Sequence, residues 1–186
     1  IGDKDIIGAG YSDRIGLRRR IGLVPQRPCP LPMSIFDNVA YGCRIHGMHP
    51  KKKELADVVE HYLTEVGLWE EVKDRLQSSA MRLSIGQQQR LCLARSLAVE
   101  PDYILADEAT SALDPVSSKI VEDLFVKLKE KYSIIMVTHT LRQALRIADY
   151  AVFLYLGEVI ETGDAKQVFN EPREELTKKY LAGVFS

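Results

Sequence analysis

Two different hydrophobic patterns occur along the chain. Across residues 34–98, apolar positions recur at helical spacing, and in the segment 51–66 they share one face. From residue 99 onward, short apolar runs without alternation, such as 103–106 and 133–137, are separated by helical patterns. Such runs are typical of buried strands that are covered on both faces of a parallel sheet. The sequence therefore predicts an α/β fold with a mainly parallel sheet and an inserted helical subdomain.

These patterns divide the chain into three expected parts. Residues 1–33 are the N-terminal remnant of the α/β core and end in a proline-rich loop, residues 34–98 form the helical subdomain, and residues 99–186 form the rest of the core. Residues 1–13 are weakly patterned and are interpreted as the remnant of a hairpin. Because the chain begins at Ile1 rather than Met, we expect the core to be incomplete at its N-terminus.

Local signals place the ends of several elements. Strands expected at 150–155 and 158–161 meet around Gly157 in a hairpin at the edge of the sheet. Side chains or glycines of the kinds that begin or end helices occur at five positions: Ser34, Gly67, Asp114, Pro115 and Asp164.

Composition is that of an ordinary soluble globular domain, with 46% hydrophobic and 27% charged residues. The net charge of −1 gives no reason to expect nucleic acid as a partner. Cys29, Cys43 and Cys92 lack the paired spacing of zinc or redox sites, so we expect reduced thiols in a cytosolic protein. The longest apolar runs are far too short for a transmembrane segment.

One stretch of the helical part has the features of an anion receptor. Ser84 and Gln87 have the spacing of a capping box, which predicts a helix start at this point. Gly86 removes a side chain where the N–H groups of the first helical turn point outward. Such a helix start favours an anion.

Two carboxylates directly follow the expected strand at 103–106. Asp107 and Glu108 stand at its carboxyl end, where open α/β sheets place their ligands. One carboxylate can hold Mg²⁺ through its water shell while the other orients and deprotonates an attacking water. The alternative is that both residues only cap a helix or form a turn.

Gln26 and His139 follow two other expected strands. Gln26 could sense a metal ion or an attacking water, and His139 could hydrogen-bond a γ-phosphate. A βαβ crossover would bring the strand before His139 near the strand that ends in Asp107 and Glu108. The alternatives are a surface glutamine in a loop and a structural or exposed histidine.

Five stretches together resemble the ATP-binding subunits of ABC transporters. Leu83 to Gln87 is similar to their LSGGQ signature, and Tyr103 to Glu108 resembles their Walker B strand with its catalytic Glu. Ser111 to Asp114 is similar to their D-loop, Val24-Pro25-Gln26 to their Q-loop, and His139 to their switch histidine. The similarity covers nearly the whole chain.

The resemblance implies a P-loop NTPase-like fold and an ATPase that uses ATP and Mg²⁺. It implies catalytic roles for Glu108, His139 and Gln26, with Asp107 and Gln26 near the metal ion. It further implies a homodimer in which four residues of one copy contact the nucleotide of the other: Ser84, Gly86, Gln87 and Asp114.

Three features depart from the pattern of that family. Ile85 stands where the signature usually has Gly, and we expect it to loosen closure of the dimer; Ala109 replaces a usual Pro. No G-x-x-x-x-G-K-[ST] string for a phosphate-binding loop occurs in the chain, and in the family this loop lies well before the Q-loop. We therefore expect the 186 residues alone to bind ATP weakly or not at all.

Several stretches resemble one branch of the family, the ATP-binding subunits of bacterial phosphate importers. They include Gln26-Arg27-Pro28 and the segments 32–35, 37–42 and 44–47. The resemblance implies integral membrane permease subunits as partners and a peripheral position at the cytoplasmic face of the cell membrane. Two alternatives stay open: an ATPase subunit for another solute, such as polar amino acids, and a truncated or degenerate domain without catalysis.

Overall fold

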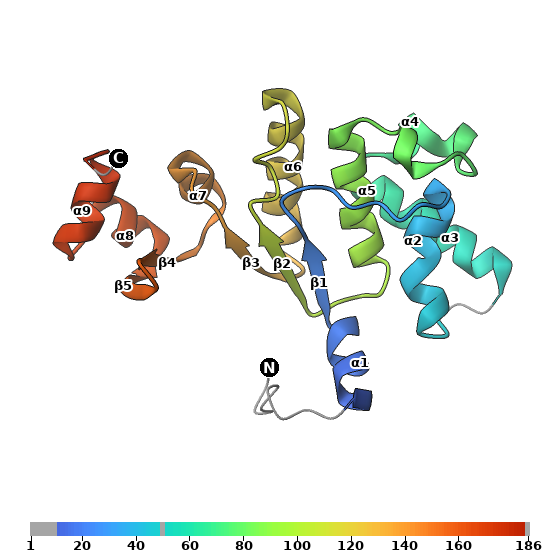
Figure 1. The fold of residues 1–186 in the computed structure, drawn as a ribbon, viewed down its shortest axis with the longest axis horizontal. Coiled ribbons are helices and arrows are strands. Elements are labelled where there is room, and N and C mark those ends of the chain that lie inside the picture. The colour runs from blue at the N-terminus through green and yellow to red at the C-terminus, as the bar shows by residue number, and fades with distance from the viewer. Residues whose placement is uncertain (1–10, 49–50, 185–186) are drawn as a thin grey trace. The chain divides into compact units, whose positions relative to one another are not determined.

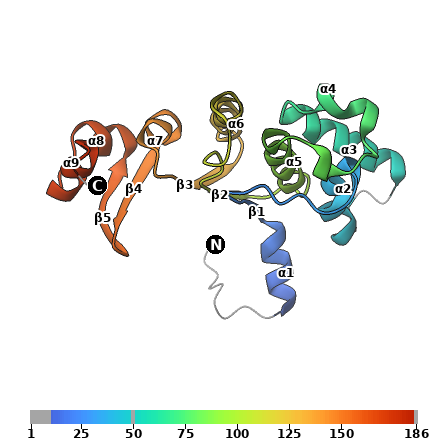
Figure 2. The same cartoon turned by 45° about the horizontal axis from the view of Figure 1, so that its top comes forward.

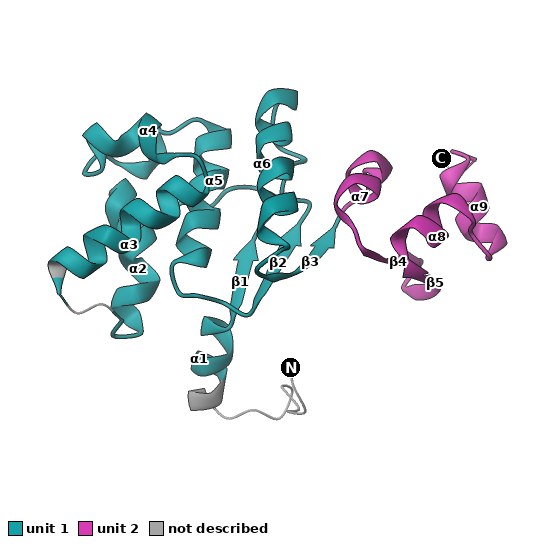
Figure 3. Ribbon diagram, turned by 180° about the vertical axis from the view of Figure 1, so that it is seen from behind, with its two compact units in different colours: residues 1–137 teal, residues 138–186 magenta. Residues whose placement is uncertain are grey.

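The fold is that of a computed structural model that describes residues 11–48 and 51–184 (Figure 1). The chain divides into two compact units at Val137 (Figure 3). The first described element is helix α1 (Tyr11–Arg19). The hairpin expected at residues 1–13 is therefore wrong for residues 11–13, which are helical, and its remainder lies outside the described residues.

The described residues of the first unit form a parallel three-stranded sheet. Its strands are β1 (Ile21–Val24), β2 (Tyr103–Asp107) and β3 (Ser133–Val137), with β2 in the centre. The register pairs Val24 with Ala106 and Asp107 with Val137. Because the strands are parallel, the residues that follow β1 and β2 emerge at the same edge. The α/β class and the parallel sheet predicted from the sequence are confirmed.

Helices α5 (Ile85–Leu97) and α6 (Pro115–Leu128) cover one face of this sheet (Figure 2). On the other face Leu23, Ile135 and Val137 are 57%, 59% and 58% exposed. The prediction that 133–137 is covered on both faces is therefore wrong within the described part of the chain. An apolar run without alternation indicates that both faces of a strand suit burial, but it does not specify what covers each face.

The helical part lies between β1 and β2 in the sequence. It comprises α2 (Ile35–Ile45), α3 (Lys52–Glu65), α4 (Trp69–Val72), two short 3₁₀ turns (Lys73–Arg75 and Ala80–Arg82) and α5. Fully buried side chains from three of its helices, Val39, Leu63 and Leu91, form its core. The expected helix ends are present: Ser34 caps α2, and Gly67 adopts a positive φ of 65° after α3.

Over its described residues, 138–184, the second unit contains a β-hairpin and three short helices. The elements are α7 (Leu141–Ile147), β4 (Tyr150–Tyr155), β5 (Glu158–Asp164), α8 (Ala165–Asn170) and α9 (Glu175–Leu181). Leu156 and Gly157 form the turn with φ of 49° and 85°, as a two-residue hairpin loop of type I′ requires. The predicted hairpin is present, but it forms a two-stranded sheet of its own, so its expected place at the edge of the parallel sheet is wrong. Strand β5 also continues past Glu161 to Asp164, which caps α8.

A buried carboxylate fastens the chain after α8 to the hairpin. The side chain of Glu161 accepts hydrogen bonds from the backbone N–H groups of Arg173 (2.9 Å) and Glu174 (3.2 Å). These bonds, that from Arg173 first, lower the pKa of Glu161 to about 2, although its burial acts in the opposite direction.

No helix in the described ranges is long and apolar enough to cross a membrane.

Candidate functional site

The end of β2 brings a carboxylate and an amide into direct contact. Glu108 follows β2, Gln26 follows β1, and the Nε2 group of Gln26 donates a hydrogen bond of 2.8 Å to Oε2 of Glu108. The backbone N–H of Glu108 donates to the carbonyl oxygen of Val137 (2.9 Å), and its φ of 44° lies in the left-handed region. Non-glycine residues adopt that region at a cost and often at functional sites. The structure therefore brings Gln26 and Glu108 together at the carboxyl ends of β1 and β2.

Asp107 stands beside this pair as the last residue of β2, and its side chain is exposed. Mg²⁺ takes oxygen ligands and is usually held by one or two carboxylates together with waters and substrate phosphates. Asp107 offers a carboxylate, and Gln26 offers its amide oxygen, since its Nε2 group is bonded to Glu108. In the described part of the chain no cluster of three or more His, Cys, Asp or Glu residues could hold a metal ion alone. The residues at this edge fit a magnesium ion that also binds phosphate.

Helix α5 begins with the capping box expected from the sequence. Oγ of Ser84 accepts from the N–H of Gln87 (3.3 Å), and Oε1 of Gln87 accepts from the N–H of Ser84 (3.0 Å). Nε2 of Gln87 also donates to Glu71 of α4 (2.7 Å). Both polar atoms of the Gln87 side chain are thus bonded within the chain. Ile85, the first residue of the helix, is 53% exposed.

Glu71 joins α4 to α5 through two partners, which the sequence did not reveal. Besides Gln87, the buried guanidinium of Arg90 pairs with the carboxylate of Glu71 (2.8 Å) and donates to the carbonyl of Gly67 (2.6 Å). Partial burial of Glu71 raises the pKa of its carboxyl, but the bonds from Arg90 and Gln87 outweigh burial and hold it below the ordinary value. The start of α5 is therefore fixed to its neighbour by charged hydrogen bonds.

Gly86 has a packing role that the sequence did not indicate. A Cβ atom at this position would lie 2.5 Å from Oγ and 2.8 Å from Cβ of Ser117, in the first turn of α6. Gly86 therefore lets the starts of α5 and α6 touch. Asp114 caps α6, because its Oδ1 accepts from the N–H groups of Val116 and Ser117 (3.0 Å each). Hydrogen bonding from Ser117 lowers the pKa of Asp114.

His139 belongs to the second unit, where its side chain is exposed. Its predicted approach to the phosphate that Glu108 serves stays a prediction.

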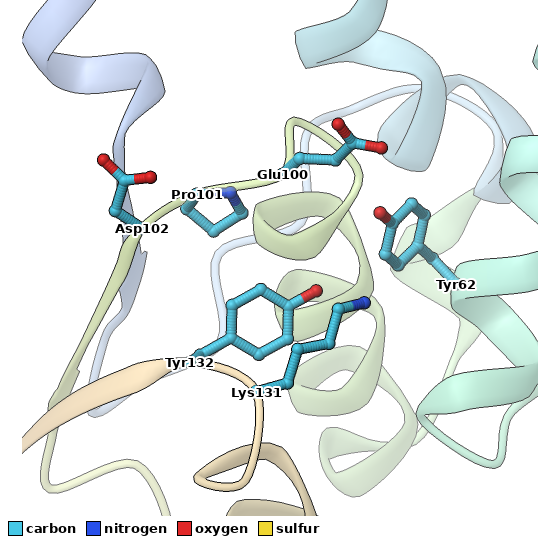
Figure 4. Close-up of a pocket in the computed structure, with 6 residues that line it drawn as sticks. All are labelled: Tyr62, Glu100, Pro101, Asp102, Lys131 and Tyr132. Atoms are coloured by element: carbon cyan, nitrogen blue, oxygen red, sulfur yellow. The ribbon is translucent and has the colours of Figure 1, made fainter.

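The opposite end of the sheet carries a pocket of about 440 Å³ (Figure 4). It is lined by residues that precede β2 and β3 and by one residue of α3: Tyr62, Glu100, Pro101, Asp102, Lys131 and Tyr132. Burial raises the pKa of the Tyr62 hydroxyl far above its ordinary value. The pocket lies at the amino ends of these strands, whereas open α/β sheets bind ligands at the carboxyl ends. It is therefore distinct from the site around Glu108.

Comparison with known proteins yields one family, a relative and a similar solved structure. The family described as ABC transporter matches residues 4–111. A protein of Bacillus licheniformis named "Phosphate import ATP-binding protein PstB 1" is 55% identical over 173 residues, which are 93% of this chain and 66% of that protein. The chain thus spans just under two thirds of the length of that relative.

A solved structure with a similar fold is cbiO1 from Clostridium perfringens, described as part of the ABC transporter complex cbiONQ. It is 27% identical, with a TM-score of 0.77 over 96% of this chain and 70% of that one. Sequence and fold thus match the same family. The chain that matches it has a three-stranded parallel sheet, a capped α5 and the hydrogen-bonded pair of Gln26 and Glu108. The chain belongs to the ABC transporter family.

Proposed function

We propose that a complete subunit containing this chain hydrolyses ATP and drives a bacterial importer for inorganic phosphate. The observation that carries this proposal is the hydrogen bond between Gln26 and Glu108 at the carboxyl end of β2, directly beside Asp107. A carboxylate held in this way can act as a general base toward a water molecule, and the neighbouring carboxylate can serve a metal ion. Membership of the ABC transporter family supports ATP as the substrate.

Each residue of the site has a defined part in the proposed reaction. Glu108 takes a proton from a water molecule as the water oxygen bonds to the γ-phosphorus of ATP, and the bond from that phosphorus to the β–γ bridging oxygen breaks to release ADP and phosphate. Gln26 holds the Glu108 carboxylate, and His139 donates to an oxygen of the γ-phosphate. Mg²⁺, when bound near Asp107 and Gln26, neutralises charge on the phosphates.

The proposed enzyme is a homodimer with two shared nucleotide sites. Ser84 and the first N–H groups of α5 at Gly86 face the nucleotide of the second copy, because a helix start favours a phosphate. Gln87 supports this helix start through the capping box and the bond to Glu71, and Asp114 holds the start of α6 next to it. The subunit attaches to membrane permease subunits at the cytoplasmic face of the membrane.

The role of Glu108 is tested by Glu108→Gln in the complete subunit. The substitution keeps size and removes the base, so ATP hydrolysis should fall by about 10²–10⁴ while ATP binding is retained. Glu130→Gln is the matched control, since Glu130 is an exposed residue beyond the end of α6. Near-normal hydrolysis by Glu108→Gln would remove the proposed base and favour a domain that only binds partners.

Phosphate as the solute is supported by the 55% identical relative, which is named for phosphate import. The complete subunit should co-purify with membrane proteins that, in lipid vesicles, take up radiolabelled phosphate only when ATP is supplied. Uptake of polar amino acids without phosphate would keep the ATPase and replace the solute.

A further inference from the structure

We infer that Gln89 is a positioning residue that sets the spacing between Gln26 and Glu108. The side-chain Nε2 group of Gln89 donates one hydrogen bond to the backbone carbonyl of Pro25 (3.0 Å) and another to that of Ala109 (2.9 Å). Pro25 directly precedes Gln26, and Ala109 directly follows Glu108. One amide group on α5 therefore holds both backbone segments that carry the catalytic pair.

The surroundings of Gln89 favour a fixed geometry. The residue is 1% exposed, and its Nε2 group donates both of its protons to the two carbonyls. Displacing a buried amide with these bonds costs free energy, because each broken bond leaves a polar group without a partner away from water. Its Oε1 atom, also buried, has no hydrogen-bond partner among residues 11–48 and 51–184. The orientation of the side chain therefore satisfies its two N–H donors and leaves its carbonyl oxygen unsatisfied.

The consequence for the reaction follows from the 2.8 Å contact between Gln26 and Glu108. Those two side chains belong to separate loops, which follow β1 and β2. Without the amide of Gln89, the loops lose their common anchor on α5, and the carboxylate loses its fixed direction. Gln89 donates to the backbone carbonyls of Pro25 and Ala109 rather than to the side chains of Gln26 and Glu108, so it acts through the loops that carry them. Through these bonds, a shift of α5 would change the position of the Glu108 carboxylate.

This inference rests on the proposed function, because it gives Gln89 a part in the reaction for which Glu108 is the base. Its test is Gln89→Met in the complete subunit, which keeps the length of the side chain and removes the donors. The kcat for ATP hydrolysis should fall about tenfold or more, since small misplacements of catalytic groups can lower rates by up to about 10². The KM for ATP should change less than about twofold, because Gln89 holds the base rather than the phosphates.

The matched control is Gln88→Met in the same helix. The side-chain amide of Gln88 donates to the carbonyl of Leu83, which directly precedes the N-cap of α5 (2.9 Å). A second control places Gln89→Met in a Gln26→Ala background. In that background, Gln89→Met should lower kcat less than it does in the wild type, because the hydrogen bond between Gln26 and Glu108 that Gln89 supports is already gone. An equal effect in both backgrounds, or unchanged kcat in the single variant, would overturn the inference.

The two proposals fail in different ways. Normal hydrolysis by Glu108→Gln overturns the proposed function, whereas a dead Glu108→Gln with a fully active Gln89→Met overturns only the role of Gln89. If Gln89→Met does not fold, a measurement on the wild-type subunit still tests the two hydrogen bonds of Gln89. The two side-chain N–H protons of Gln89, observed by NMR in the ¹⁵N-labelled subunit, should exchange slowly with solvent; rapid exchange would exclude the two bonds.

Discussion

The side chains of Gln87 and Gln89 show how closely support and chemistry lie together at the level of single residues. Gln87 completes the cap of α5 and bonds to Glu71, while Gln89 reaches the loops that carry Gln26 and Glu108. The two residues are of the same type and two positions apart, yet one is half-buried and the other fully buried. Substitution at either position will therefore change stability as well as activity, and only kinetic comparisons separate the effects.

Glu161 gives the clearest pH-dependent prediction. Its folded pKa of about 2 lies below the ordinary value of 4.5, so its contribution to stability is complete above pH 4.5 and is lost as the pH falls toward 2. Glu161→Gln should therefore lower the unfolding temperature of the second unit at pH 7 and lower it much less near pH 2. Thermal unfolding between pH 2 and pH 7 measures this difference.

Glu158→Gln serves as the control for this prediction, because Glu158 lies on the same strand with an exposed side chain. It should leave the unfolding temperature nearly unchanged at every pH. A constant gap between Glu161→Gln and the wild type across the whole pH range would contradict the assignment.

At the level of elements, α5 joins several parts of the first unit around the site. It is tied to α4 through Glu71, to the ends of β1 and β2 through Gln89, and to α6 through the contact of Gly86 with Ser117. The capping box at its start was predictable, because the two partners are three residues apart. The bonds of Gln89 were not, because their acceptors lie 64 and 20 residues away in the sequence.

The contact between α5 and α6 predicts a compensating pair of substitutions. Gly86→Ala should destabilise the protein by about 1–3 kcal/mol, because its Cβ has no room beside Ser117. Adding Ser117→Gly removes the obstructing atoms and should restore part of that loss. The free energy of unfolding in urea, measured for both single variants and the double variant, tests this coupling.

Gly16→Ala is the control, because no atom of the described residues lies within 4 Å of a Cβ at that position in α1. Alanine in an open helix should stabilise the protein slightly, by about 0.5–1 kcal/mol. If Gly86→Ala behaves in the same way as Gly16→Ala, α5 and α6 do not meet as closely as described.

At the scale of the whole molecule, the sequence predicted the class of fold and the parallel sheet from local hydrophobic patterns. The hydrogen bond between Gln26 and Glu108 was not predicted, because its two partners lie 82 residues apart in the sequence. The exposure of Ile135 and Val137 was not predictable, because an apolar strand does not specify what covers it. The approach of His139 to Glu108 could be predicted but stays open, because the two residues belong to different units.

The 186-residue chain by itself should not bind Mg-ATP tightly and saturably. The sequence contains no phosphate-binding loop of the form G-x-x-x-x-G-K-[ST], and a helix start contributes only about 0.3–1 kcal/mol, up to about 2 when partly buried. Isothermal titration calorimetry of the chain, with a complete subunit as positive control, measures this. A submicromolar dissociation constant for the chain alone would show that its own residues suffice.

The contact between residues 86 and 117 also constrains how such a sequence can evolve. A larger side chain at position 86 meets Oγ and Cβ of Ser117, so it is tolerated better once position 117 has lost its side chain, and the order of the two changes matters. Lineages that vary the signature at this glycine should first have acquired glycine at position 117, and the reverse order should be absent from their ancestors.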